Sequence, residues 1–116
     1  MIDSTPRFLN GAFRFTGDGY EAPGLLHPSL VYTVPFDKRA QLIYLRLGNS
    51  SSEMVYVSLM HEGKPIRLFP VGARGSSHVP LAVVEDLPPE SRIELFLAAP
   101  SGCSGTAVID LGLVEI

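Results

Sequence analysis

Three short apolar runs decide the fold, and they lie in residues 41–71, QLIYLRLGNSSSEMVYVSLMHEGKPIRLFPV. The first two alternate in side-chain character, as a strand does when it buries one of its faces. Clusters of Gly, Asn, Ser and Pro separate the runs, and these residues are typical of turns. We therefore predict strands over 41–47, 54–60 and 66–71, joined as a three-strand antiparallel meander.

The alternation also assigns each side chain of the meander to a face. The face predicted to form the core carries Ile43, Leu45, Leu47, Val55, Val57 and Leu59. The face predicted to point outward carries Leu42, Tyr44, Arg46, Met54, Tyr56, Ser58 and Met60. Several of these outward side chains are large and apolar, which indicates an interface.

Similar runs continue on both sides of this stretch, and none has the 3.6-residue period of a helix. They predict further strands over 12–16, 30–34, 79–85, 92–98 and 106–115. Pro88-Pro89 is rigid and extended, which suits a connection that crosses between two sheets. We predict an all-β fold: one domain, residues 1–116, built as a two-sheet antiparallel β-sandwich of about eight strands, Ig-like or jelly-roll in topology.

Composition narrows the choice of partners. Charged residues make up only 18% of the 116 residues, below the roughly 25% usual for soluble domains. A small domain with so few charges is expected to cover part of its surface with a second copy, so we predict a homo-oligomer. The net charge of −3 and the scattered Lys and Arg residues disfavour nucleic-acid binding.

Cysteine usage and hydropathy bear on location. The single cysteine, Cys103, rules out an intrachain disulfide and fits a reducing compartment. No apolar run approaches the roughly 20 residues of a membrane-spanning helix, and the first residues lack the pattern of a secretory signal. The expectation is a cytoplasmic chain with no membrane contact.

The outward apolar residues carry the main functional hypothesis. Tyr and Met are enriched in protein interfaces, so we predict a non-enzymatic module that self-associates and docks a partner protein. The predicted interface residues are Tyr44, Met54, Tyr56, Met60 and Phe96. The alternative is a small-ligand binding domain, with a carbohydrate stacked on Tyr44 and Tyr56, because aromatic faces suit apolar C–H surfaces.

A second ligand hypothesis concerns the loop from Gly72 to His78, GARGSSH. Its glycines permit a nest of backbone N–H groups, and nearby basic side chains would add donors to an anion. The residues predicted for this anion site are Arg67, Arg74 and His78. No phosphate-loop pattern accompanies them.

Motifs for catalysis or metal binding are lacking. His27, His61 and His78 have no metal-ligand spacing, and no base lies near Cys103 in the sequence to activate it. We therefore predict no metal, no cofactor and no catalytic residue. An enzyme using His61 or His78 with Glu62 has no spacing to support it, and the carboxylates Asp110 and Glu115 are assigned to solvated surface.

Overall fold

The computed structural model describes residues 4–116, apart from the side chains of residues 82–85. Nine strands and one short 3-10 turn, Pro28–Leu30, make up the regular structure of the described residues, which contain no α-helix. The strands are β1 (Thr5–Thr16), β2 (Gly24–Leu25), β3 (Val31–Thr33), β4 (Ala40–Asn49), β5 (Val55–His61), β6 (Lys64–Val71), β7 (Ser76–Leu87), β8 (Arg92–Ala98) and β9 (Ser104–Glu115). All eight predicted strands are present, several of them longer than predicted.

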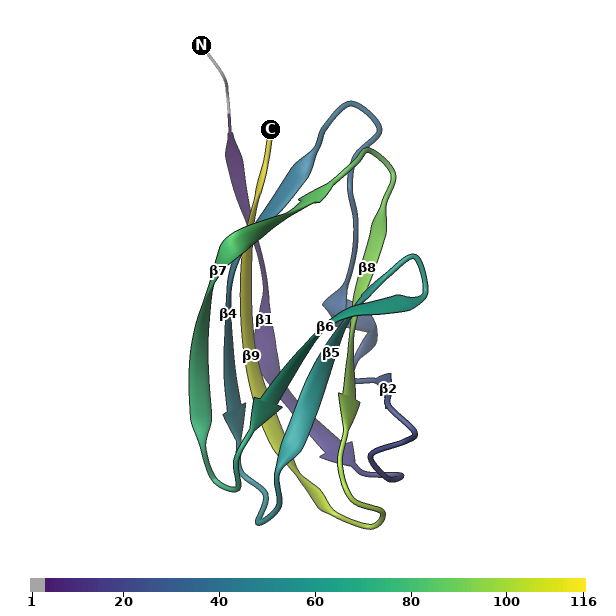
Figure 1. Ribbon diagram of the computed structural model, residues 1–116, viewed down its shortest axis with the longest axis vertical. Coiled ribbons are helices and arrows are strands. Elements are labelled where there is room, and N and C mark those ends of the chain that lie inside the picture. The colour runs from purple at the N-terminus through teal and green to yellow at the C-terminus, as the bar shows by residue number, and fades with distance from the viewer. Residues whose placement is uncertain (1–3) are drawn as a thin grey trace.

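The strands form two antiparallel sheets that pack face to face (Figure 1). The four-stranded sheet has the order β1-β9-β4-β7. The five-stranded sheet has the order β2-β8-β5-β6, and β3 also pairs with β8. The fold is thus the all-β sandwich predicted from the sequence. Because the first and last strands pair in one sheet, the order is that of a jelly roll rather than an Ig domain.

The predicted three-strand meander is wrong. β5 and β6 do form a hairpin, but β4 belongs to the other sheet, where it pairs with β7 and β9. The chain crosses between the sheets after β4, and Asn49 is bonded to residues of this connection and of the β6–β7 turn. Its buried side chain donates to the carbonyls of Glu53 (2.8 Å) and Gly72 (3.1 Å) and accepts from the amide of Ser51 (3.0 Å). The predicted crossing at Pro88-Pro89 is confirmed, since β7 and β8 lie in different sheets.

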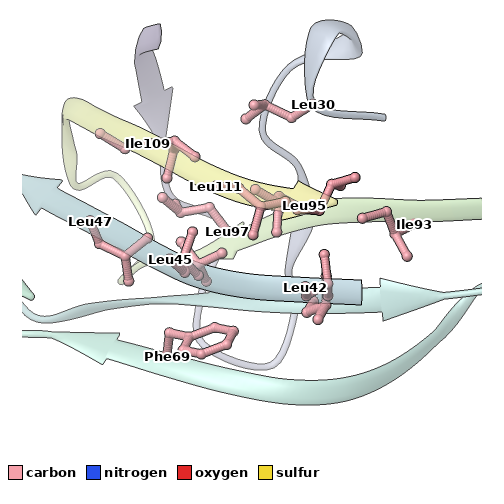
Figure 2. Close-up of a cluster of buried hydrophobic side chains, with 14 of the residues drawn as sticks. Leu30, Leu42, Leu45, Leu47, Phe69, Ile93, Leu95, Leu97, Ile109 and Leu111 are labelled. Carbon is pink, nitrogen blue, oxygen red and sulfur yellow. The ribbon is translucent and has the colours of Figure 1, made fainter. Parts of the chain in front are cut away.

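The core lies between the sheets, and its side chains point toward one another from both (Figure 2). Leu95 and Ile93 of β8 oppose Leu111 and Ile109 of β9, each with at most 1% of its surface exposed. The alternation in 92–98 and 106–115 predicts these inward faces, with Ile93, Leu95 and Leu97 opposite Ile109, Leu111 and Leu113. Burial of such side chains contributes about 1.5–3 kcal/mol each.

One face assignment in β4 is wrong. Leu42 is fully buried and Ile43 is 42% exposed, the reverse of the prediction. The register of β4 shifts between Leu42 and Tyr44 against both neighbouring strands. Such a bulge inserts one extra residue, so the alternation before it is out of phase with the alternation after it. Leu45 and Leu47, which follow the bulge, are buried as predicted.

Candidate functional site

The outer face of the five-stranded sheet carries an apolar groove with a volume of about 530 Å³. The register places Leu25, Phe96, Ser58 and Leu68 in one row across β2, β8, β5 and β6. Paired residues of neighbouring strands share a face, so this row crosses the groove. Ser58 and Met60 form the floor, Phe96 and Pro23 one wall, and Leu68 and Pro65 the other.

Depth in the groove follows from the strand that each residue occupies. The small Ser58 on the central strand is only 2% exposed and Met60 only 9%, whereas Leu68 on the edge strand is 63% exposed. The Ser58 hydroxyl donates its proton to Sδ of Met60 (3.3 Å), so this proton is already bonded within the protein. The floor of the groove therefore offers a ligand no hydroxyl proton from Ser58.

Tyr56, which lines the groove, is bonded to the segment before β2. Its hydroxyl donates to the carbonyl of Tyr20 (2.6 Å), and the Tyr20 hydroxyl donates to the carbonyl of Met54 (2.7 Å). The two tyrosine rings stack with centroids 6.3 Å apart. These bonds hold the segment before β2 against β5 and against Met54, which directly precedes β5 and is 44% exposed.

Tyr44 lies elsewhere. Alternation and chain order predict Tyr44 and Tyr56 on neighbouring strands, but β4 and β5 are in different sheets. Of the predicted interface residues, the structure brings Met54, Tyr56, Met60 and Phe96 to the five-stranded sheet and leaves Tyr44 on the outer face of the other sheet. A single platform containing both tyrosines does not exist.

The outer face of the four-stranded sheet carries a second hollow, with a volume of about 450 Å³ and a lining surface that is mostly apolar. We name it the polar pocket after the charged side chains at its rim. Its residues include Arg46, Gly48, Ser76, His78, Val108 and Asp110. His78, Arg46 and Asp110 form one cross-strand row over β7, β4 and β9. The next row is Ser76, Gly48 and Val108, and the missing side chain of Gly48 leaves the hollow in its middle.

Tyr44 contacts all three polar side chains of the first row. Its hydroxyl donates to Oδ1 of Asp110 (3.1 Å), the Arg46 guanidinium lies 5.3 Å from its ring centroid, and the His78 ring meets it edge-on at 6.0 Å. Desolvation first, and then the hydrogen bond and charge of Asp110, raise the pKa of Tyr44. Tyr44 finds room because it lies over Gly112, where a Cβ would be 2.1 Å from its Cε2.

The residues predicted for the anion site do not come together. Arg67 lines the apolar groove on the five-stranded sheet, and His78 lines the polar pocket on the four-stranded sheet. Arg74 lies in the turn between β6 and β7, where its amide donates to the carbonyl of Ser51 (2.9 Å). The enzyme hypothesis pairs Glu62 with either histidine: His61 ends β5 directly before Glu62, and His78 lies in β7 of the other sheet. Oε1 of Glu62 accepts a hydrogen bond from the amide of Arg92 (2.6 Å).

The sequence does not predict the row of His78, Arg46 and Asp110, and the prediction for the carboxylate of Glu115 is wrong. Alternation places Arg46 and Asp110 outside, but only the pairing of β4 with β9 makes them neighbours. Glu115, assigned to solvated surface, is 4% exposed. It accepts hydrogen bonds from the Tyr32 hydroxyl and from Nε of Arg7 (3.2 Å), and so it joins β1, β3 and β9. Burial and the Glu115 contact raise the pKa of Tyr32 strongly.

The described residues contain no group of three or more His, Cys, Asp or Glu side chains placed to hold a metal ion. Within the same residues, no helix has the length and apolar character needed to span a membrane.

The protein is similar to known proteins in its structure and not in its sequence. No family model matches the sequence, and no curated protein does. The fold is similar to that of the CBM36-1 domain of a multidomain xylanase from the hindgut metagenome of Trinervitermes trinervoides, with a TM-score of 0.57 and 18% identity over 95% of this chain and 96% of that one. It is also similar to part of a chain from the infectious bursal disease virus Gx strain, with a TM-score of 0.52 and 11% identity over 97% of this chain and 32% of that one. At these identities the likeness establishes the fold, a two-sheet β-sandwich.

Proposed function

We propose that the chain is a non-enzymatic interaction module whose apolar groove docks a short apolar segment of another protein. The observation that carries the proposal is the groove itself, an apolar hollow of about 530 Å³ on a sheet face that would otherwise meet water. Hollows of roughly 300–1,000 Å³ are typical of binding sites. Met, Phe, Leu, Ile and Pro side chains make up most of its lining, and Tyr56, Ser58 and Arg67 complete it.

Shape and area favour a segment over a second copy. An isologous dimer needs a self-complementary surface, whereas two facing grooves would enclose an empty space. The strands β8, β5 and β6 have 7, 7 and 8 residues. These three strands form a small face, and a stable interface buries about 800 Å² of accessible surface on each partner. A segment that inserts its side chains needs less area.

The polar side chains that line the groove are Arg67, Tyr56 and Ser58. The Tyr56 hydroxyl donates to Tyr20 and the Ser58 hydroxyl donates to Met60. A ligand rich in hydroxyl groups would lose its bonds to water in the groove and gain few in return. An apolar peptide side chain carries no such cost.

The test selects binding peptides from a random peptide library and compares two variants. Leu68→Asp puts a charge on the groove wall, and Ile43→Asp puts the same charge on an exposed strand position of the other sheet. We expect selected peptides to carry spaced apolar residues and to bind Leu68→Asp at least about tenfold more weakly, ~1.4 kcal/mol. Binding to Ile43→Asp should equal that of the original chain.

Two results would contradict the proposal. One is selection of peptides whose binding survives Leu68→Asp, because those peptides would then lie elsewhere. The other is a dimer in light scattering that Leu68→Asp dissociates, because the groove would then be covered by a second copy. Circular dichroism of both variants confirms that each is folded.

Carbohydrate binding is a second candidate function. The shared fold with the CBM36-1 domain, a carbohydrate-binding module, supports it, and so does the polar pocket beside Tyr44. No observation favours the anion version of the ligand hypothesis, since Arg67, Arg74 and His78 lie at three separate places. The carbohydrate would sit on the sheet opposite the groove, so the two functions do not compete for one surface.

A further inference from the structure

We infer that the polar pocket of the four-stranded sheet binds the ring of an uncharged sugar, held between His78, Arg46 and Asp110 above the backbone of Gly48. The inference rests on the second candidate function and gives it a site. It is independent of the apolar groove, which lies on the outer face of the other sheet.

The floor of the pocket suits a sugar ring. Gly48 exposes backbone where its neighbours in the row, Ser76 and Val108, carry side chains. Val108 is 53% exposed and offers a methyl surface beside the hollow. A sugar ring has an apolar C–H face that can lie on such a floor while its hydroxyl groups point to the rim.

The rim supplies both kinds of hydrogen-bonding group. The guanidinium of Arg46 only donates hydrogen bonds and the carboxylate of Asp110 only accepts them. The neutral imidazole of His78 donates through one nitrogen and accepts through the other. Sugar hydroxyls both donate and accept, so adjacent hydroxyls can bond to Arg46 and to the carboxylate of Asp110. Only Oδ1 of that carboxylate is bonded to Tyr44.

The charges of the rim point to a ligand without charge. Arg46 and Asp110 are directly paired across β4 and β9. Their opposite charges compensate each other, so neither an anion nor a cation gains a net attraction at the pocket. Neutral hydroxyl groups gain charge-assisted hydrogen bonds from both side chains.

Tyr44 holds the rim in place before the ligand arrives. It contacts Arg46, His78 and Asp110 at once, and it lies over Gly112, where no side chain competes for its space. Side chains that are already ordered lose less conformational entropy on binding. The pocket is therefore built around Tyr44 as a positioning residue.

The test is an amide NMR titration with methyl glycosides of glucose, galactose, mannose and xylose, and with inorganic phosphate as the anionic probe. We expect at least one glycoside to shift the amides around positions 46–48, 76–78 and 108–110. Gly48→Val fills the hollow, since a Cβ there meets only Val108, at 3.4 Å. It should weaken binding at least tenfold.

A matched control is Gly24→Val, because Gly24 is also a strand glycine and a Cβ there meets nothing within 4 Å. Its glycoside affinity should be unchanged. If Gly48→Val is unfolded by circular dichroism, His78→Ala takes its place, with the same tenfold loss expected.

Three outcomes would overturn the inference. In the first, no glycoside shifts any amide of the pocket at millimolar concentration. In the second, only phosphate shifts them, which would make the pocket an anion site. In the third, glycoside shifts survive both Gly48→Val and His78→Ala. Shifts confined to β5, β6 and β8 would instead place a sugar in the apolar groove and contradict the docking proposal as well.

Discussion

Asn49 is expected to determine whether β4 and β5 can lie in different sheets. Its side chain makes four hydrogen bonds: Nδ2 donates to the carbonyls of Glu53 and Gly72, and Oδ1 accepts from the amide and the hydroxyl of Ser51. Asn49 is 4% exposed, so water cannot replace these bonds. The side chain thus joins the β4–β5 connection to the start of the β6–β7 turn.

The magnitude follows from these four bonds. Each contributes about 0.5–1.5 kcal/mol net, and Asn49→Ala also leaves buried carbonyls without a donor. The single proton of the Ser51 hydroxyl lies within reach of both Oδ1 of Asn49 and the carbonyl of Glu53 (3.0 Å), so in Asn49→Ala it donates to Glu53, which reduces the loss. We expect the free energy of unfolding to fall by about 3 kcal/mol. With a slope of about 2 kcal/mol per molar urea, the midpoint falls by about 1.5 M.

The assay is urea unfolding followed by far-UV circular dichroism, because the chain has no Trp to report by fluorescence. The chain offers a matched control in Asn10, its other asparagine, which is exposed on β1. Asn10→Ala should change the free energy of unfolding by less than about 0.5 kcal/mol. Asn49→Asp, which loses both donors, should be at least as destabilised as Asn49→Ala.

Either of two results would refute this reasoning. A loss below about 1 kcal/mol for Asn49→Ala would mean that the corner is held by the strand pairing and not by the side chain. An equal loss for Asn10→Ala would mean that the assay reports on asparagine in general rather than on this buried network.

Three further outcomes are expected. The pKa of Tyr32 is raised, so the folded chain keeps the phenolic proton at a pH where the unfolded chain releases it. The contribution of Tyr32 to the free energy of unfolding is therefore complete below about pH 10 and is lost as the pH rises above that. Between about pH 9 and 11, thermal unfolding should show a smaller loss of stability for Tyr32→Phe than for the original chain, and an identical loss would contradict the assignment. Gly112→Ala should cost about 1–3 kcal/mol, because the new Cβ must displace the Tyr44 ring; urea unfolding checks this against Gly24→Ala, and equal midpoints for the two variants would sink the idea. The low charge content predicts a homo-oligomer, and light scattering over a range of concentrations tests it, with a monomer throughout as the contrary result.

The amino-acid sequence determined the strands and most of the inward faces. Alternation in 54–60, 92–98 and 106–115 assigns the core correctly because a strand has a side-chain period of two, and that period is a local property. Proline at 88 and 89 predicts the crossing between sheets for a similarly local reason, since it restricts the backbone there. Together these signals suffice for a two-sheet sandwich.

The tertiary structure alone decided which strands are neighbours. A side-chain period of two predicts the face of the strand on which a residue lies, and it does not predict the partner strand. Arg46 and Asp110, 64 positions apart in the sequence, are therefore neighbours only because β4 pairs with β9. The same limit separates Tyr44 from Tyr56. The bulge beside Ile43 depends on two neighbouring strands at once, and the burial of Glu115 depends on Tyr32 and Arg7. Both surfaces proposed to bind are therefore products of long-range pairing, because each is a row of side chains that only the folded sheets bring together.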